Sequence, residues 1–240
     1  MANKKKIEER QHALDRHRTE RIIQIIGGVV LVLIVLGILW LVFAGNPGEE
    51  AATLPTDVPA PAGDTSSPSA TTLQYDAYPP MTVDSSKQYF ATVTMENGGQ
   101  FTIQLYPDKA PKAVNSFVFL SEQGYFNGVT FHRVLEGFMA QGGDPTGTGM
   151  GGPGYEFENE DSDLTFDKDG VVAMANAGRD TNGSQFFITF GPQEFLNGGY
   201  TIFGQVTEGM DVVNGLTRRD PDQAPNFQGD AIETVEITEQ

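Results

Sequence analysis

Three short patterns in this 240-residue chain could bind a ligand, and each has a simpler interpretation. Residues 147–152 match the G-x-G-x-x-G phosphate-binding pattern, but Pro153 and Gly154 prevent the helix whose N-terminus would hold a pyrophosphate. The acidic residues between 156 and 169 lack the order of an EF-hand, which has glycine at its sixth position. Residues 182–184 fit the N-glycosylation sequon, a three-residue pattern that is common by chance. We therefore expect loops here, not nucleotide or calcium sites.

The composition excludes further kinds of chemistry. There is no cysteine, so thiol nucleophiles, disulfides and cysteine-ligated zinc are excluded. With only three histidines present, we expect no metal site and no cofactor. Residues 22–240 contain 8 basic and 28 acidic side chains, a net charge of −20. Because phosphate backbones are bound by Lys and Arg, no nucleic-acid partner is expected.

Two dense segments carry the strongest functional signal. They are residues 131–144 (FHRVLEGFMAQGGD) and residues 174–188 (MANAGRDTNGSQFFI), and shorter stretches at 195–198 and 203–210 accompany them. Together they closely resemble the hallmark stretches of the cyclophilin family of peptidyl-prolyl cis/trans isomerases, over essentially all of residues 87–240. The resemblance implies a mostly β fold: a closed eight-stranded antiparallel β-barrel capped by two α-helices. It also implies an isomerase without metal or cofactor.

The resemblance assigns a role to individual residues. Rotation about an X-Pro bond is opposed by amide resonance, with a barrier of about 18–20 kcal/mol. Arg133 is expected to donate a hydrogen bond to the prolyl nitrogen in the twisted state, oriented by Gln141, while an apolar slot holds the proline ring. Without the resemblance, Arg133 would more often be a surface cation. Phe138, Met139 and Phe187 would more often be core residues. The expected catalytic residues are Arg133, Gln141 and Phe138, and the expected substrate-binding residues are Met139, Ala175, Asn176, Gln185, Phe187, Phe195, Leu196 and Tyr200.

Two of these positions depart from the best-known eukaryotic members of the family. Phe195 stands where those members often have tryptophan, and Tyr200 stands where they often have histidine. Both positions stay aromatic, so turnover should survive. Because the indole N–H donor is missing at the rim of the slot, we expect weak binding of cyclosporin.

The elements that must position these residues follow from the hydrophobic pattern. Alternation in 89–95 and 101–105 around Asn97-Gly98-Gly99 predicts a hairpin, and an apolar face from Pro111 onward predicts a helix. A second short helix is expected at 210–216. Further short strands are expected at 129–135, 171–175, 186–190, 201–206 and 232–238. This pattern alone favours a mostly antiparallel barrel.

Upstream of this domain the sequence changes character twice. Residues 22–44 have Gln24 as their only strongly polar side chain and would span about 35 Å as a helix. Following the seven basic residues of segment 1–21, they predict an uncleaved signal anchor, with a cleaved signal peptide or a buried helix as alternatives. The chain would then be a bacterial-like, single-pass cell-membrane protein with a cytoplasmic N-terminus and an extracytoplasmic domain.

Residues 45–86 contain seven prolines and no basic residue, which predicts a flexible linker between the anchor and a domain at 87–240. A ligand for a proline-binding partner is the alternative. The expected function is peptidyl-prolyl isomerisation during the folding of exported proteins, with proline-containing polypeptides as partners. The alternatives are a non-catalytic proline-peptide-binding chaperone or assembly module, and a tethered stalk with an incidental barrel.

Overall fold

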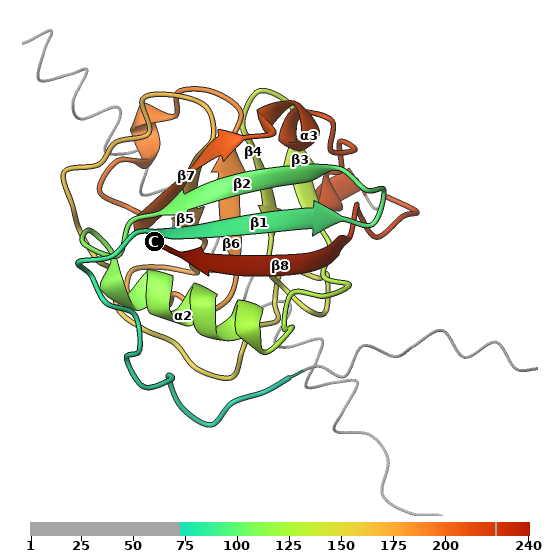
Figure 1. The fold of residues 1–240 in the computed structure, drawn as a ribbon. Helices are drawn as coiled ribbons and strands as arrows, with labels where there is room; N and C mark the ends of the chain where they lie inside the picture. The colour runs from blue at the N-terminus through green and yellow to red at the C-terminus, as the bar shows by residue number, and fades with distance from the viewer. Residues whose placement is uncertain (1–72, 224) are drawn as a thin grey trace, which may run out of the picture. The chain divides into compact units, whose positions relative to one another are not determined.

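The computed structural model describes residues 73–223 and 225–240 (Figure 1). Segments 1–21, 22–44 and 45–72 lie outside the described residues. The described chain contains β1 (Tyr89–Met95), β2 (Gln100–Leu105), α2 (Pro111–Glu122), β3 (Arg133–Leu135), β4 (Met139–Gly142), β5 (Val171–Met174), β6 (Phe186–Thr189), the 3₁₀ turn η1 (Glu194–Leu196), β7 (Ile202–Glu208), α3 (Met210–Asn214), the 3₁₀ turn η2 (Pro221–Gln223) and β8 (Ile232–Glu239).

The strands form one antiparallel sheet in the order β3-β4-β6-β5-β7-β2-β1-β8. The predicted hairpin is confirmed: β1 pairs with β2 from Tyr89 opposite Leu105 to Thr94 opposite Gln100. Gly98 in the connecting turn has φ +82°, a conformation that favours glycine. Alternate residues of β1 are buried, so one face of the hairpin lies on the core.

The predicted closure of the barrel is wrong. The edge strands β3 and β8 do not pair with each other, and the sheet curls into an open half-barrel (Figure 1). β3 has only three residues, and its free side is taken by another segment: Val134 and Arg219 exchange backbone hydrogen bonds of 2.7 and 2.9 Å. Next to it, an isolated bridge joins Thr130 to Ala231. These contacts cover the edge without closing the ladder.

Two strand assignments differ from the sequence pattern. The strand expected over 129–135 is limited to β3, and β4 was not predicted. β4 is short and ends at Gly142, and a turn at Gly137, with φ +67°, separates it from β3. Glycines on this side of the sheet interrupt the alternation on which the prediction depended.

The core is built from aromatic rings inside the curled sheet. Phe117 of α2 lies 5.5 Å from Phe186, with the rings edge to face, and 5.4 Å from Phe203. All three side chains are buried, which stabilises the fold by about 1.5–3 kcal/mol each. A second, smaller cluster lies beside β4, β5 and β6 and supports the site described below; its buried members are Met139, Phe166, Val171, Ala173, Phe187, Leu196 and Ile202.

Residues 73–86, here called the N-terminal strap, fall within the expected linker but lie against the domain. Figure 1 shows this segment passing outside α2 before it enters β1. The fully buried Asn115 of α2 holds the strap: its Oδ1 accepts hydrogen bonds from the backbone N–H groups of Thr82 (2.8 Å) and Val83 (3.2 Å), and its Nδ2 donates to the carbonyl of Pro80 (3.1 Å). The strap is thus part of the folded unit.

The predicted membrane placement requires correction. In the described ranges no helix is long and apolar enough to cross a membrane. The longest, α2, has 12 residues and spans about 18 Å, well short of a bilayer core of about 30 Å. This finding contradicts the single-pass cell-membrane localisation, with its transmembrane signal anchor and membrane partner. The segment that suggested it, residues 22–44, lies outside the described residues.

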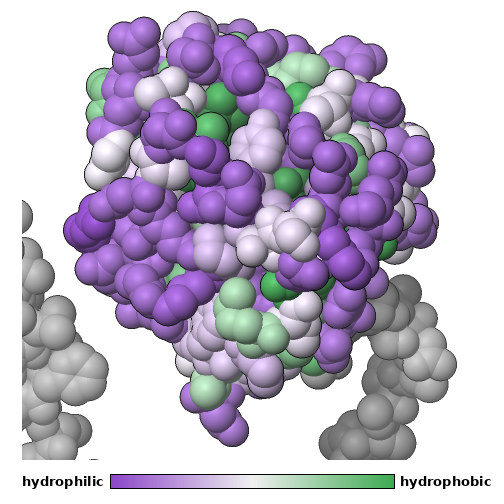
Figure 2. Space-filling view, turned by 60° about the vertical axis from the view of Figure 1, so that its left-hand side comes forward, coloured by the Kyte–Doolittle hydropathy of each residue, from purple (hydrophilic) through white to green (hydrophobic). Residues whose placement is uncertain are grey.

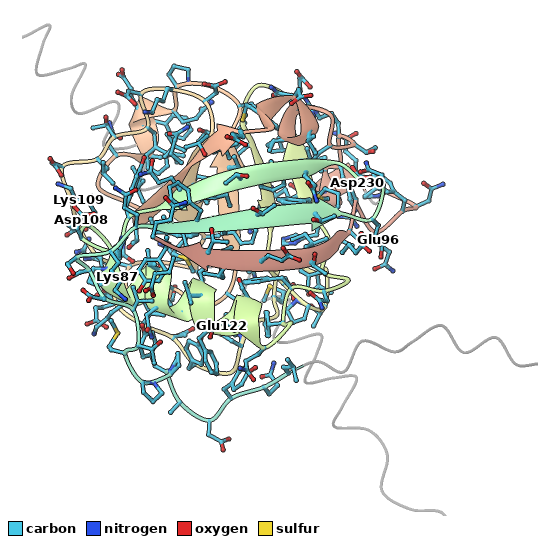
Figure 3. The ribbon with its side chains drawn as sticks, in the orientation of Figure 1. Lys87, Glu96, Asp108, Lys109, Glu122 and Asp230 are labelled. Atoms are coloured by element: carbon cyan, nitrogen blue, oxygen red, sulfur yellow. The ribbon has the colours of Figure 1, made fainter. Side chains whose placement is uncertain are left out.

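Charged side chains lie around the outside of the domain. Asp108 and Lys109 lie at one end and Glu96 and Asp230 at the other (Figure 3). The face shown in Figure 2 is largely hydrophilic, with apolar residues in small, separate areas. The ion pairs that the described residues form are exposed, as between Lys109 and Asp163 at 2.7 Å, and each contributes at most about 1 kcal/mol. The charge therefore affects solubility more than the fold.

Candidate active site

The hairpin of β3 and β4 presents a polar pair at its open end. Arg133 lies opposite Gln141 in the register, and Gln141 lies opposite Phe187 of β6. Residues directly opposite each other in a sheet point to the same face, so these three side chains form a row across three strands. The sheet thus brings a guanidinium, an amide and an aromatic ring together, although they are far apart in the sequence.

Beside this row lies a small pocket of about 200 Å³. Its apolar wall is nearly inaccessible to solvent: Met139 is 2% exposed, Phe187 5% and Leu196 8%. Phe187 stacks on Phe166 at 5.7 Å and meets Tyr200 edge to face at 5.4 Å, which fixes the ring in place. The pocket brings together nine of the eleven predicted site residues: Arg133, Phe138, Met139, Gln141, Ala175, Asn176, Phe187, Leu196 and Tyr200.

The two remaining predicted residues lie next to this pocket. The Phe195 ring is 74% exposed and lies 5.8 Å from the ring of Phe138, so it stands at the rim. Gln185 lies on the other side, where its Oε1 accepts a 3.0 Å hydrogen bond from Nε2 of Gln141. The resemblance implied that both residues belong to the groove, and the structure puts them at its two flanks.

Arg133 differs from the other arginines that the structure describes. Arg179 and Arg218 pair with Asp161 and Glu136, and Arg219 donates to the carbonyls of His132 and Phe227. Within the described ranges, Arg133 has neither a carboxylate partner nor a hydrogen-bond acceptor. Its guanidinium lies 5.9 Å from the centre of the Phe138 ring. A half-buried guanidinium without a protein partner can donate to a ligand in the pocket.

A second, larger hollow of about 680 Å³ adjoins the small pocket, and the two share Gln141, Ala175 and Asn176. This hollow was not predicted from the sequence. Part of its wall is formed by residues 149–152 of the glycine-rich loop that matched the phosphate-binding pattern, and the apolar Met150 among those glycines was the available signal. Gln74 also lines it, and no signal pointed there because Gln74 fell in the expected linker.

The loop that lines the larger pocket is held by one buried carboxylate. Asp144 accepts hydrogen bonds from the backbone N–H groups of Thr146 (2.7 Å), Gly149 (2.6 Å) and Gly151 (3.1 Å). Burial alone would raise the pKa of Asp144, but these bonds and the Thr146 hydroxyl lower it below its usual value. Gly143, with φ +86°, admits no side chain, because a Cβ would lie 2.3 Å from the carbonyl oxygen of Ser184. The loop is therefore rigidly anchored next to the site.

His132 precedes Arg133 but points elsewhere. It is 2% exposed, and neither ring nitrogen has a hydrogen-bond partner among the described residues. Burial lowers the pKa of His132, so the neutral imidazole is favoured. The described ranges hold no group of three or more acidic or histidine side chains that could bind a metal. The site combines a hydrogen-bond donor, Arg133, with an apolar slot.

Comparison with known proteins agrees with this geometry. Residues 90–238 match the family described as cyclophilin type peptidyl-prolyl cis-trans isomerase/CLD. Peptidyl-prolyl cis-trans isomerase-like 1 of Mus musculus is 48% identical over 142 residues, which cover 58% of this chain and 83% of the relative. Peptidyl-prolyl cis-trans isomerase B of Bacillus subtilis is 46% identical over 128 residues, covering 52% and 89%.

A solved structure is also similar. The crystal structure of a Cryptosporidium parvum cyclophilin type peptidyl-prolyl cis-trans isomerase superposes with a TM-score of 0.56 and 34% identity, and covers 63% of this chain and 98% of its own. A second crystal structure of that protein, in the presence of the dipeptide Ala-Pro, gives the same TM-score at 35% identity. The family match spans more than half of the chain, and its relatives are named for the same activity, so this chain belongs to the cyclophilin-type peptidyl-prolyl cis-trans isomerase family and is an isomerase of that type.

Proposed function

We propose that the chain accelerates rotation about X-Pro bonds by holding the proline ring in the small pocket while Arg133 donates a hydrogen bond to the prolyl nitrogen. Twisting the bond breaks amide resonance and returns a lone pair to that nitrogen. The nitrogen accepts a hydrogen bond better in the twisted state than in the planar one. A donor that gains strength only in the twisted state lowers the barrier, by a factor of ten in rate for each 1.36 kcal/mol.

The other predicted residues take supporting roles in this proposal. Phe138, Met139, Phe187 and Leu196 exclude water and hold the ring, and Tyr200 continues the aromatic wall. Gln141 orients Arg133 and contacts the peptide backbone, while Ala175, Asn176 and Gln185 line the path of the chain on one side. Phe195 contacts it at the rim. The substrates are flexible proline-containing polypeptides.

The observation that carries the proposal is the unpartnered guanidinium of Arg133 beside a buried apolar wall. Within the described residues the other arginines are all bound to protein acceptors, so this cation alone among them keeps its donors for a ligand. A guanidinium serves here because it stays charged at any physiological pH and presents its donors in a fixed plane.

The test compares catalysed cis/trans exchange of a capped Ala-Pro peptide by the full chain and two arginine variants, measured by NMR exchange spectroscopy. Arg133→Ala should lower kcat/KM by about 100-fold, in the range found when a donor to a transition state is removed. Arg218→Ala is the matched control: it removes an arginine that pairs with Glu136 and covers the Phe190 ring, away from both pockets. It should keep full activity.

Two outcomes would contradict this assignment. If Arg133→Ala kept the full rate, Arg133 would not stabilise the twisted bond. If the wild-type chain bound the peptide but did not accelerate its cis/trans exchange, the non-catalytic binding module would be the better account. The surface argues against a holdase, which needs a broad apolar patch. In the described ranges the only exposed large hydrophobic side chains are Met81, Met150 and Phe195.

A further inference from the structure

The N-terminal strap reaches the edge of the peptide groove. We propose that it is a working part of that groove, with Gln74 as a residue that positions the larger pocket and governs the binding of peptide residues flanking the proline. This inference rests on the proposed function, because it takes the small pocket as the place of the proline ring. It adds a determinant that lies outside the stretch matched by the family, residues 90–238.

Two hydrogen bonds attach the strap to the pocket loop. Nε2 of Gln74 donates to the carbonyl of Gly152 at 2.7 Å, and the backbone N–H of Tyr75 donates to the carbonyl of Pro153 at 2.8 Å. The backbones approach so closely that a Cβ on Gly154 would lie 2.5 Å from the carbonyl oxygen of Tyr75. Gln74 is thus both a lining residue of the pocket and a tether of its loop.

The strap is itself firmly held, so the part of the pocket wall that it forms is preorganised. Tyr75 meets the Phe119 ring edge to face at 5.0 Å, and Tyr78 meets Tyr155 at 5.6 Å. The hydroxyl of Tyr78 donates to the backbone carbonyl of Lys112 at 2.7 Å. With the clamp by Asn115, these contacts join the strap to α2 on one side and to the pocket loop on the other. Wall elements held in this way need little ordering when a peptide binds.

The tethered loop connects the strap to Gln185 and, through it, to Gln141, which lies opposite Arg133 in the register. Gly149 and Gly151 of this loop accept hydrogen bonds from Nε2 of Gln185 at 3.0 and 2.8 Å. Oε1 of Gln185 in turn accepts from Gln141. Through the loop, the strap therefore supports the side-chain amide of Gln185, which in turn orients Gln141.

The geometry also indicates what the larger pocket takes. Gln141, Ala175 and Asn176 line both pockets, so a peptide whose proline fills the small one passes along this shared wall into the large one. There it meets the thioether of Met150, which is 90% exposed, the amide of Gln74 and glycine backbone groups. Such a mixed wall fits an extended peptide segment, contacted by hydrogen bonds and by one flexible apolar side chain.

The experiment measures a preference for peptide length. The full chain and its variants are assayed by NMR exchange spectroscopy on a capped Ala-Pro dipeptide and on an eight-residue peptide with Ala-Pro at its centre. The dipeptide fills the small pocket alone, whereas the longer peptide reaches the large one. For Gln74→Ala and Gln74→Glu, the ratio of kcat/KM for the long peptide to that for the short one should fall about twofold to tenfold, the usual effect of one hydrogen bond.

Gln100→Ala is the matched control. Gln100 is an exposed glutamine that donates to Thr94 at 3.0 Å on the β1–β2 hairpin, and it lines neither pocket. In Gln100→Ala the ratio of kcat/KM for the long peptide to that for the short one should equal the wild-type ratio. Calorimetric Kd values for the eight-residue peptide give a second readout, which should rise by the same factor in both Gln74 variants. Gln74→Glu keeps the length of the side chain but replaces the donor with a carboxylate, whereas Gln74→Ala removes the donor without adding charge. A fall shared by both variants is therefore due to the lost hydrogen bond and not to a loss of volume or to an added charge.

An unchanged ratio and Kd in both Gln74 variants would overturn the inference, and so would an equal fall in Gln100→Ala. Failure of the proposed function looks different. If the wild-type chain accelerated neither peptide, the catalytic assignment would fail, while the calorimetric comparison would still decide whether Gln74 shapes the groove. Arg133→Ala should lower the rate on both peptides by the same factor, which separates the chemistry at the arginine from the length preference.

Discussion

The side-chain amide of Gln141 donates a 3.0 Å hydrogen bond to Oε1 of Gln185. The direction of this bond is set by the neighbours of Gln185. Its Nε2 faces the carbonyls of Gly149 and Gly151, so its oxygen must face Gln141. Nε2 of Gln141 is thereby occupied. A chain of amide orientations thus extends from the pocket loop to Gln141, the residue opposite Arg133 in the β3–β4 register.

Gln185→Glu tests this chain of amides. The variant has nearly the same size but would direct a carboxylate oxygen at two backbone carbonyls, which should displace the loop and free Gln141. We expect kcat/KM on a Pro-containing peptide to fall about tenfold, equivalent to about 1.4 kcal/mol. The measurement is catalysed exchange, together with a thermal melt to confirm folding.

The control for this variant is Gln205→Glu. Nε2 of Gln205 donates to the carbonyl of Asp169 at 2.9 Å on β7, away from both pockets, so the substitution creates the same kind of clash elsewhere. It should lower stability but leave kcat/KM unchanged. Equal losses of kcat/KM in the two variants would mean that Gln185 acts only through general stability.

Asn115→Ala should destabilise the domain by about 2–4 kcal/mol. The side chain is fully buried and makes hydrogen bonds to Thr82, Val83 and Pro80, so the variant leaves several strap groups without a partner. Urea unfolding of the full chain measures the change. Asn214→Ala, at the exposed end of α3, should change stability by no more than about 0.5 kcal/mol. A loss below 1 kcal/mol for Asn115→Ala would mean that the strap adds little to the folded state.

The fold was predictable where a local pattern repeats over several residues. The β1–β2 hairpin follows from seven alternating residues and a turn at Gly98, and α2 follows from its apolar face after Pro111. β4 has only four residues and ends at a glycine, so no period could be read from it. The open edge was not predictable either, because it depends on Arg219 pairing with Val134, a contact between segments far apart in the chain.

In the site, too, local sequence segments were predictable and contacts between distant segments were not. The resemblance placed Arg133 and the apolar wall in one pocket, since those residues lie in the two dense segments. Gln74 could not be found in that way. It belongs to a proline-rich stretch that cannot build a core alone, and it is held only by tertiary contacts to Gly152 and, through the strap, to Asn115. Composition describes what a segment does in isolation, and here the domain supplies the missing partners.

Phe195→Trp should strengthen inhibition by cyclosporin. Phe195 stands at the rim of the small pocket, 74% exposed, and offers a ring without a polar group. An indole adds one N–H donor, so we expect the inhibitory concentration to fall about threefold to tenfold. Inhibition of exchange is measured for wild type, Phe195→Trp and Met81→Trp, which adds an indole at another exposed position. Nanomolar inhibition of the wild type would show that the rim donor is not needed.

Stability should fall as pH falls through the ordinary pKa of histidine, because His132 is buried in its neutral form. Burial chiefly lowers the pKa of His132; Arg219 and Arg133 act in the same direction, and Asp144 opposes them. Below about pH 6.5 the unfolded chain therefore binds a proton that the folded chain resists, and the free energy of unfolding decreases. Glu160, whose pKa is raised by burial, acts with the opposite sign at lower pH.

Urea unfolding at pH 7.5 and 5.5 measures this effect, with His132→Gln as the comparison. The variant replaces the titrating ring with a neutral amide, and the other histidines, His12 and His17, are the same in both chains. The wild type should lose more stability than the variant between the two pH values, since only the wild type carries the buried imidazole. Equal losses would show that His132 takes up its proton as easily in the folded state as in the unfolded one.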